Sequence, residues 1–166
     1  MAAVRFHEIV GLNTACDRSI LDISRVELDR DTQLPRFNMP LERGADLGLR
    51  LAGAANQRTR RTLVLDAERH RYDVTLSDIS GMDIEAHDND IRRMIGVVRD
   101  WLNANRGSRP ILPGAAAIAA DHAAYLAIAP GIIAALRLDP HNDLPHRDYL
   151  NVVEQALPLI EQARMA

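Results

Sequence analysis

Cysteine and aromatic residues are scarce in this 166-residue chain. A single cysteine, Cys16, rules out a disulfide within the chain and favours a reducing, cytoplasmic location. Aromatic residues make up 4% of the sequence, so the core must be built mainly from Ala, Leu and Ile. Interiors of that kind are typical of helices packed on helices or on a parallel sheet.

An excess of positive charge and a long apolar run are also missing. The formal net charge is -3, which gives no general attraction to phosphate backbones, so we expect no nucleic-acid partner. No stretch reaches the roughly 20 apolar residues of a membrane span, and no leader peptide is recognisable, so we expect no membrane partner. The 47% hydrophobic content argues against disorder.

The motifs of several common chemistries are absent. The histidines lack the paired helical spacing of a zinc protease, and the acidic cluster at 83–90 lacks the Gly and Glu of a calcium loop in register. Neither a phosphate-binding P-loop nor a serine nucleophile elbow occurs. We therefore expect no metal site and no bound cofactor. The histidines are His7, His70, His87, His122, His141 and His146.

Three short apolar runs, at 19–24, 62–66 and 83–87, have the character of buried parallel strands. Amphipathic stretches that predict helices alternate with them, at 5–15, 38–53 and 91–102, with a further short helix at 72–80 and a loop at 25–37. In the helix at 38–53, Gly44 and Gly48 would let it approach the sheet closely. The stripe that contains Val98 and Trp101 should be buried. This order predicts an α/β fold with helices on both faces of a parallel sheet.

A change of composition near Pro110 divides the chain. We expect an α/β domain at 1–106 and a C-terminal helical layer at 107–166, packed on it. The layer should contain an Ala-rich helix at 114–129, broken by Pro130 and resumed at 132–138. A last helix should carry Tyr149, Val152, Val153, Ala156 and Ile160 on one face.

The opening helix leaves no strand ahead of the run at 19–24. An uncovered edge of that strand would present unpaired backbone groups. We therefore expect a sheet that lacks its first strands, and a homo-oligomer or a partner chain that completes it.

Polar residues gather where the predicted strands end. Ligands of open parallel sheets bind beyond the carboxyl ends of the strands. Asp22 and Ser24 end the first strand and Asp66 ends the second, while Asn38 and Glu42 begin the helix that follows the first strand. Such groups suit ribose hydroxyls, a base edge, or a positively charged anomeric carbon. They also have plainer interpretations, which remain open: Glu42 as a first-turn acid, Asp22 as a loop cap and Asn38 as a helix cap.

The stretch DISRVELDRDTQLPRFNMPLERGADLG resembles bacterial proteins related to Toll/interleukin-receptor (TIR) domains and nucleoside 2-deoxyribosyltransferases. The similarity continues through RRTLVLDAERHRYDVTLSDISGMDIEAHDNDIRRMIGVVRDWL and spans about residues 17–102. It implies a flavodoxin-like sheet and a nucleotide or NAD ligand. It also implies a catalytic Glu that acts on an N-glycosidic bond, at the position of Glu42, preceded by an acid at the position of Asp22.

Two departures from that family pattern affect the functional interpretation. Arg43 replaces a usually apolar residue and would lower the pKa of its neighbour Glu42. The family's opening strand and its Gly- or Ser-bearing loop have no counterpart before Val4, so the chain resembles a shortened member. Two functions stay open: an N-glycosidase or transferase, and a non-catalytic nucleotide-sensing or oligomeric interaction module. Arg58, Arg60 and Arg61 have two interpretations: they contact a phosphate, or they form a solvated loop before a strand.

Overall fold

The computed structural model describes residues 2–24, 33, 38–74, 76, 84–139 and 144–165, with side chains from residue 6 onward except that of Val74. The chain forms two compact units, Met1–Ile111 and Leu112–Ala166, and each is described by itself below. The predicted loop at 25–37 lies outside the described residues apart from Gln33. Most of the short helix predicted at 72–80 also lies outside them.

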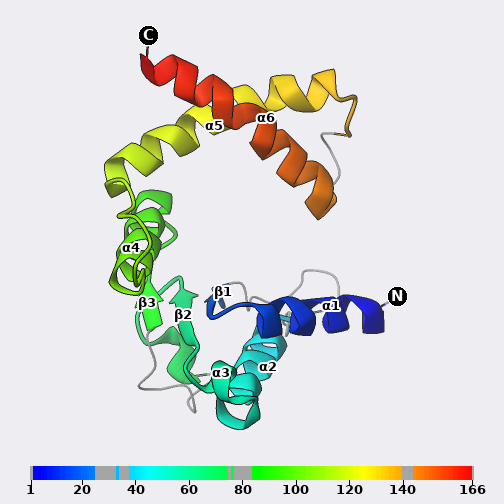
Figure 1. Cartoon of the computed structure of the whole chain (residues 1–166), viewed down its shortest axis with the longest axis vertical. Coiled ribbons are helices and arrows are strands. Elements are labelled where there is room, and N and C mark those ends of the chain that lie inside the picture. Colours follow the sequence, from blue (N-terminus) through cyan, green and yellow to red (C-terminus); the bar gives the residue numbers. More distant parts are fainter. Residues whose placement is uncertain are drawn as a thin grey trace. The chain divides into compact units, whose positions relative to one another are not determined.

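The first unit is an α/β fold, as the sequence predicts, with a three-stranded parallel sheet in the order β1-β2-β3 (Figure 1). In register, Ile20 of β1 lies beside Leu63 of β2, and Val64 of β2 lies beside Ile84 of β3. The elements are α1 (Ala2–Ala15), β1 (Arg18–Asp22), α2 (Asn38–Ala52), α3 (Ala55–Arg58), β2 (Arg61–Asp66), the 3₁₀ helix η1 (Arg71–Val74), β3 (Ile84–Ala86) and α4 (Ile91–Ala104).

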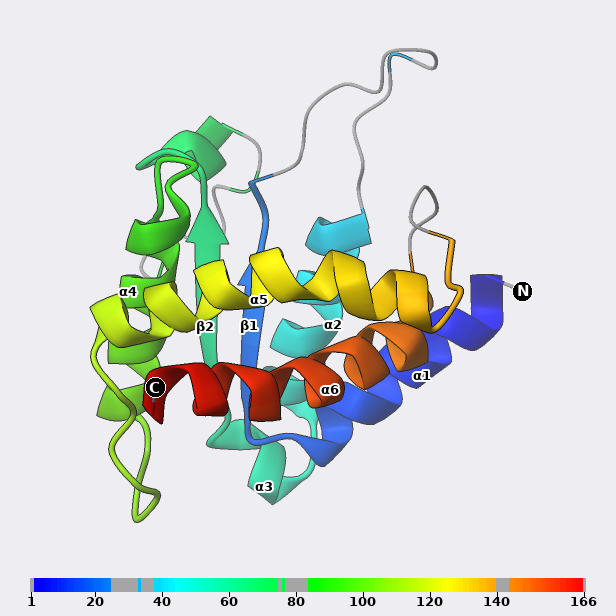
Figure 2. The ribbon, with the colours of Figure 1, turned by 90° about the horizontal axis from the view of Figure 1, so that it is seen from above.

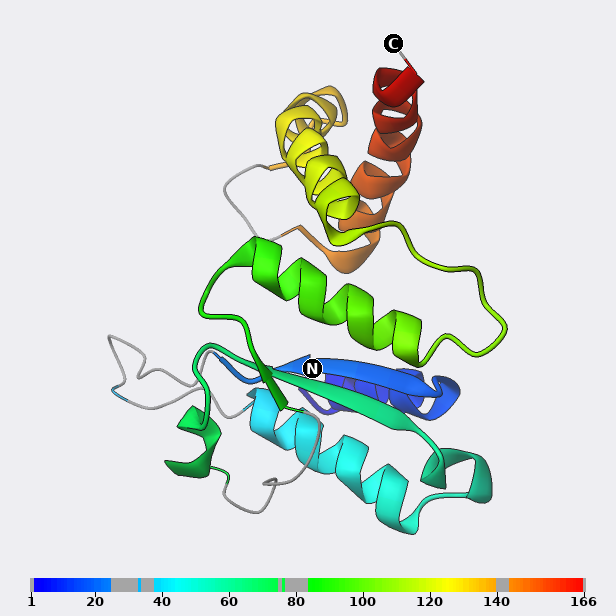
Figure 3. The same ribbon diagram turned by 90° about the vertical axis from the view of Figure 1, so that its left-hand side faces the viewer.

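The central strand is buried on both faces because a helix covers each one, with α2 and α4 on opposite sides of the sheet (Figure 3). On the α2 side, Ile23 and Val64 pack with Met39. On the α4 side, Leu63 and Leu65 pack against Trp101. Alternating side chains of β2 therefore supply two separate apolar layers.

The helix predicted at 91–102 is confirmed as α4. Its N-cap is Asp90, whose carboxylate accepts hydrogen bonds from the backbone N–H groups of Arg92 and Arg93. Trp101 is buried, as predicted, whereas Val98 is only half-buried at the margin of the same cluster.

Helix α1 lies on the side of β1 that faces away from β2 (Figures 2 and 3), and it packs on α2. The flank that the sequence leaves without a strand therefore has a helix beside it, which is one way of protecting a sheet edge. The C-terminal carbonyls of α1 anchor it: Arg60 Nη1 donates to Asn13 O at 2.8 Å, and Gln57 Nε2 donates to Thr14 O at 2.7 Å. No described side chain of α1 is fully buried.

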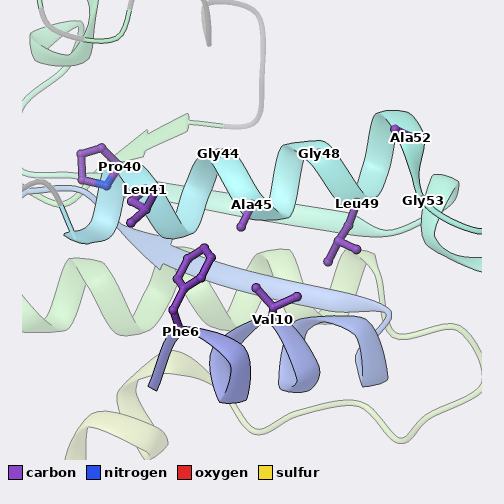
Figure 4. A pocket seen from close by; sticks show the side chains of 10 residues that line it. All are labelled: Phe6, Val10, Pro40, Leu41, Gly44, Ala45, Gly48, Leu49, Ala52 and Gly53. Atoms are coloured by element: carbon purple, nitrogen blue, oxygen red, sulfur yellow. The ribbon is translucent and has the colours of Figure 1, made fainter. Parts of the chain in front are cut away.

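An apolar groove of about 650 Å³ runs along the seam between α1 and α2 (Figure 4). Phe6 and Val10 line it from α1, and Leu41, Ala45 and Leu49 are among the residues that line it from α2. Gly44 and Gly48 also line this groove, and a Cβ on either would meet nothing within 4 Å. The expectation that these glycines bring α2 close to the sheet is therefore wrong, because the sheet-facing side of α2 carries Met39, Arg43 and Asp46.

Gly48→Ala should stabilise the protein by about 0.5–1 kcal/mol, because alanine favours the helix and its methyl group enters open space. Urea unfolding followed by circular dichroism measures this change. The matched control is Gly53→Ala, whose Cβ would lie 2.3 Å from Leu49 O and should destabilise the protein. Equal losses of stability in both variants would contradict the open groove.

The second unit is a pair of helices, α5 (Ala115–Ala135) and α6 (His146–Met165). Pro130 lies inside α5 without ending it, so the predicted break there is wrong. Proline removes one hydrogen bond, and the packing of its neighbours Ala129 and Ile132 against α6 outweighs that loss. On the face of α6 that the sequence predicts, Val152, Ala156 and Ile160 are buried, while Tyr149 is exposed and Val153 half-buried.

Helix α5 is also long and apolar enough, by length and composition, to cross a membrane. Its mean hydropathy reaches 1.5, and only 11% of the stretch is buried within the structure. The sequence expectation that no run has this character therefore overlooked an Ala-rich helix in which Asp121 and His122 are the polar interruptions. Asp121 forms an ion pair with Arg164 of α6.

Candidate functional site at the carboxyl edge of the sheet

Three polar residues mark the carboxyl ends of the three strands. Asp22 is the last residue of β1, Asp66 is the last residue of β2, and His87 follows β3 directly. Because the strands are parallel, all three meet at one edge of the sheet. Asp22 and Asp66 were predicted from the sequence and His87 was not, although its position at the end of a strand was the same signal.

Asp22 is held in place but still accessible. Its Oδ1 accepts a hydrogen bond of 2.9 Å from the backbone N–H of Ser24, a short turn that fixes the carboxylate. The same Oδ1 lies 3.6 Å from Nε2 of His87. The Asp22 side chain is 40% exposed, whereas that of His87 is 2% exposed. Asp22 can therefore meet a ligand directly, while His87 lies beneath it.

The loop after β3 fixes the tautomer of His87. Its Nδ1 accepts a hydrogen bond of 3.1 Å from the backbone N–H of Asn89, so the proton of the neutral ring is on Nε2. Asp88 and Asn89 have φ angles of 52° and 56°, in the left-handed region that these two residue types tolerate. The N–H of Asp88 bonds to Ala67 O at 2.8 Å and ties the loop to the end of β2.

Asp66 has a different environment. It is 1% exposed, and its Oδ1 accepts bonds from the backbone N–H of Ala67 at 2.7 Å and from Nε of Arg71 at 3.1 Å. Arg71 also donates to the carbonyl of Ser24. The strand register puts Asp66 on the α2 side of the sheet and Asp22 on the α4 side. Asp66 therefore ties the edge together, and only Asp22 of this pair is open to solvent.

Asn38 and Glu42 lie in the first turns of α2, which begins at this edge. Asn38 is the first helical residue and is exposed, while Glu42 is half-buried. By helical spacing, Glu42 lies between the sheet-facing side and the groove side of α2. Within the described residues, no hydrogen bond or ion pair links it to Asp22. The structure therefore places both acids at one edge without joining them.

Arg43, the residue that the sequence pairs with Glu42, points inward instead. Its Nη1 lies 2.9 Å from Oδ2 of Asp46, and both residues are buried. Arg60 Nη2 lies 2.9 Å from Oδ1 of the same carboxylate. Burial lowers the pKa of the Arg43 guanidinium from its ordinary value, and the Asp46 charge opposes that shift. Arg60 is therefore neither a phosphate ligand nor part of a solvated loop.

A polar pocket of about 140 Å³ lies where η1 meets β3, with Glu68, Arg69 and Tyr72 among its lining residues. Ligand sites usually enclose 300 Å³ or more, so this pocket is too small for a whole nucleoside. Across the part of the chain that the structure describes, no group of three or more His, Cys, Asp or Glu side chains is placed to hold a metal ion.

No protein-family profile matches the chain, and comparisons with curated proteins and with solved structures found no significant match.

Proposed function

We propose that this protein binds a ribose-containing ligand, a nucleotide or NAD, at the carboxyl edge of its sheet, with Asp22 accepting hydrogen bonds from the ribose hydroxyls. The observation that carries the proposal is the half-exposed Asp22 carboxylate, oriented by the N–H of Ser24 at the end of a parallel strand. A carboxylate accepts hydrogen bonds and donates none, so it suits a vicinal diol.

Glu42 would supply chemistry at the same edge. Glu42 is the fifth residue of α2 and is half-buried, and Arg43 beside it is engaged with Asp46, so Arg43 does not hold the Glu42 carboxylate away from the ligand. In hydrolysis, the bond from the anomeric carbon to the base nitrogen breaks and the electron pair leaves with the base. Water adds its hydroxyl to the carbon, and its proton passes to the leaving base or, for nicotinamide, to solvent. Glu42 stabilises the cationic sugar between these steps.

The second candidate is a non-catalytic sensing or oligomeric module. The apolar groove between α1 and α2 favours it, because Leu41 on its wall is 59% exposed in the single chain. Failure of every ligand to bind in the titration below would leave this candidate standing.

The ligand proposal is tested by titrating the protein with NAD, nucleotides and free nucleosides in a calorimeter. Asp22→Asn should weaken binding by about tenfold or more, because it removes a charged acceptor from the hydroxyls. The control is Asp17→Asn. Asp17 is 66% exposed and directly precedes β1, at the amino ends of the strands, so this variant should leave the affinity unchanged. Equal affinities of wild type and Asp22→Asn would contradict the assignment.

A further inference from the structure

His87 has a buried hydrogen-bond donor that the rest of the site does not use. Within the described residues, its Nε2 has no hydrogen-bond partner, although the side chain is only 2% exposed. Buried polar groups are nearly always paired, because an unpaired one loses its bonds to water without replacement. Oδ1 of Asp22 lies 3.6 Å from this nitrogen, which is too long for a hydrogen bond.

The tautomer of His87 decides what this nitrogen can do. Since Nδ1 accepts the Asn89 N–H, a neutral His87 carries its proton on Nε2. A metal ion at Nε2 would require the proton to move to Nδ1, where it would face the Asn89 N–H. The ring is therefore set to donate from Nε2 towards Asp22.

We propose that His87 is a positioning residue for Asp22. When Asp22 binds a ligand hydroxyl, the 3.6 Å distance between Asp22 Oδ1 and His87 Nε2 shortens to that of a hydrogen bond. The second half of this proposal depends on the ligand proposal above. Oδ1 then has two donors, the N–H of Ser24 and Nε2–H of His87, while Oδ2 makes no hydrogen bond within the described residues and faces the ligand.

The physical reason is solvent exclusion. Water solvates the exposed side of Asp22 in the free protein and competes with the buried donor. A ligand that covers the carboxylate removes this water, and the remaining hydrogen bonds strengthen in the lower local dielectric. His87 thus adds affinity only when the ligand engages Asp22.

Two substitutions separate positioning from simple structural support. His87→Gln retains an N–H donor near the place of Nε2, whereas His87→Leu has none. We expect about tenfold weaker ligand binding for His87→Leu and a smaller loss for His87→Gln. In the Asp22→Asn background, His87→Leu should weaken ligand binding little further, because the carboxylate that His87 positions is gone. Equal losses in both backgrounds would overturn the proposal.

The ligand-free protein supplies an independent readout. Nitrogen-15 NMR of the histidine rings should show His87 as the Nε2-protonated tautomer. Its Nε2–H signal should move in Asp22→Asn and stay in place in Asp17→Asn. An Nδ1-protonated ring, or an Nε2–H signal that does not move in Asp22→Asn, would overturn the proposal. This experiment decides the His87–Asp22 contact even if no ribose ligand binds, so its failure is distinct from failure of the ligand proposal.

Discussion

Replacing Asp46 by alanine is expected to lower the free energy of unfolding by about 3–5 kcal/mol, the usual cost of removing one partner from a buried ion pair. Asp46 is 0% exposed and lies between two buried arginines, Arg43 and Arg60. Without it, the two guanidinium charges would remain in the interior without the carboxylate that neutralises them.

The hydroxyl groups of two strands depend on the same carboxylate. Ser19 Oγ donates to Asp46 Oδ1 at 2.7 Å, and Thr62 Oγ1 donates to Asp46 Oδ2 at 2.6 Å. Asp46 therefore links α2 to β1 and β2 as well as balancing charge. Alanine removes all of these bonds at once, so the loss should exceed that of a single hydrogen bond.

Urea unfolding of Asp46→Ala, followed by circular dichroism, measures this prediction. Glu42→Gln is the matched control, because Glu42 lies one turn earlier on the same helix, is half-buried and takes no part in this network. It should change stability by no more than about 0.5 kcal/mol. If Asp46→Ala unfolds at the same urea concentration as Glu42→Gln, the buried network does not exist as described.

The strands could be predicted from the sequence because each is a short apolar run bounded by polar residues. The runs at 19–24, 62–66 and 83–87 correspond to β1 (Arg18–Asp22), β2 (Arg61–Asp66) and β3 (Ile84–Ala86). Each predicted end agrees with the observed one to within one residue, except the end of β1, which comes two residues earlier. Burial from two sides leaves little room for polar side chains in such strands. The α/β class follows from the alternation of these runs with helical periods.

The buried network could not be predicted, because its charged residues look like surface residues in the sequence. Arg43 and Asp46 stand in a helix with exposed charges, and Arg60 stands in a basic run before a strand. Only the fold shows that α2 turns Arg43 and Asp46 towards the sheet, where Arg60 meets them. Long-range pairs of this kind leave no periodic signal.

The candidate site was predictable in part for the same reason. Asp22 was recognisable because it ends a strand, and the structure confirms that position. The burial of Asp66 on the other face of the sheet could not be predicted. Side chains alternate between the two faces, and the register between strands is a property of the fold. His87 ends the predicted run at 83–87 just as Asp66 ends the run at 62–66, so its position was recognisable, but its burial beneath Asp22 depends on the fold.

Glu42→Gln is expected to abolish release of nicotinamide or free base while leaving ligand affinity largely intact. The amide preserves the size of the side chain but removes the negative charge that stabilises the cationic sugar. Losing such a charge from a reacting centre typically lowers the rate by 10² or more. Binding changes little, because the ribose contact belongs to Asp22.

The assay measures base release from NAD and from a panel of nucleosides and nucleotides, by wild type and by three variants. Asp22→Asn should raise the ligand concentration needed for half-maximal rate, whereas Asp17→Asn should behave as wild type. Arg43→Leu is unsuitable as a further variant, because it would remove a partner of the buried Asp46 and disturb the fold.

Stability separates a chemical effect of Glu42→Gln from a structural one. If Glu42→Gln unfolds at the same urea concentration as wild type but has lost turnover, the carboxylate acts on the reaction itself. Turnover by Glu42→Gln at the wild-type rate would exclude Glu42 as the catalytic residue. If wild type binds a ligand without cleaving it, Asp22 and its ribose contact would remain as a sensing site, because binding depends on Asp22 at the end of β1 and cleavage on Glu42 of α2.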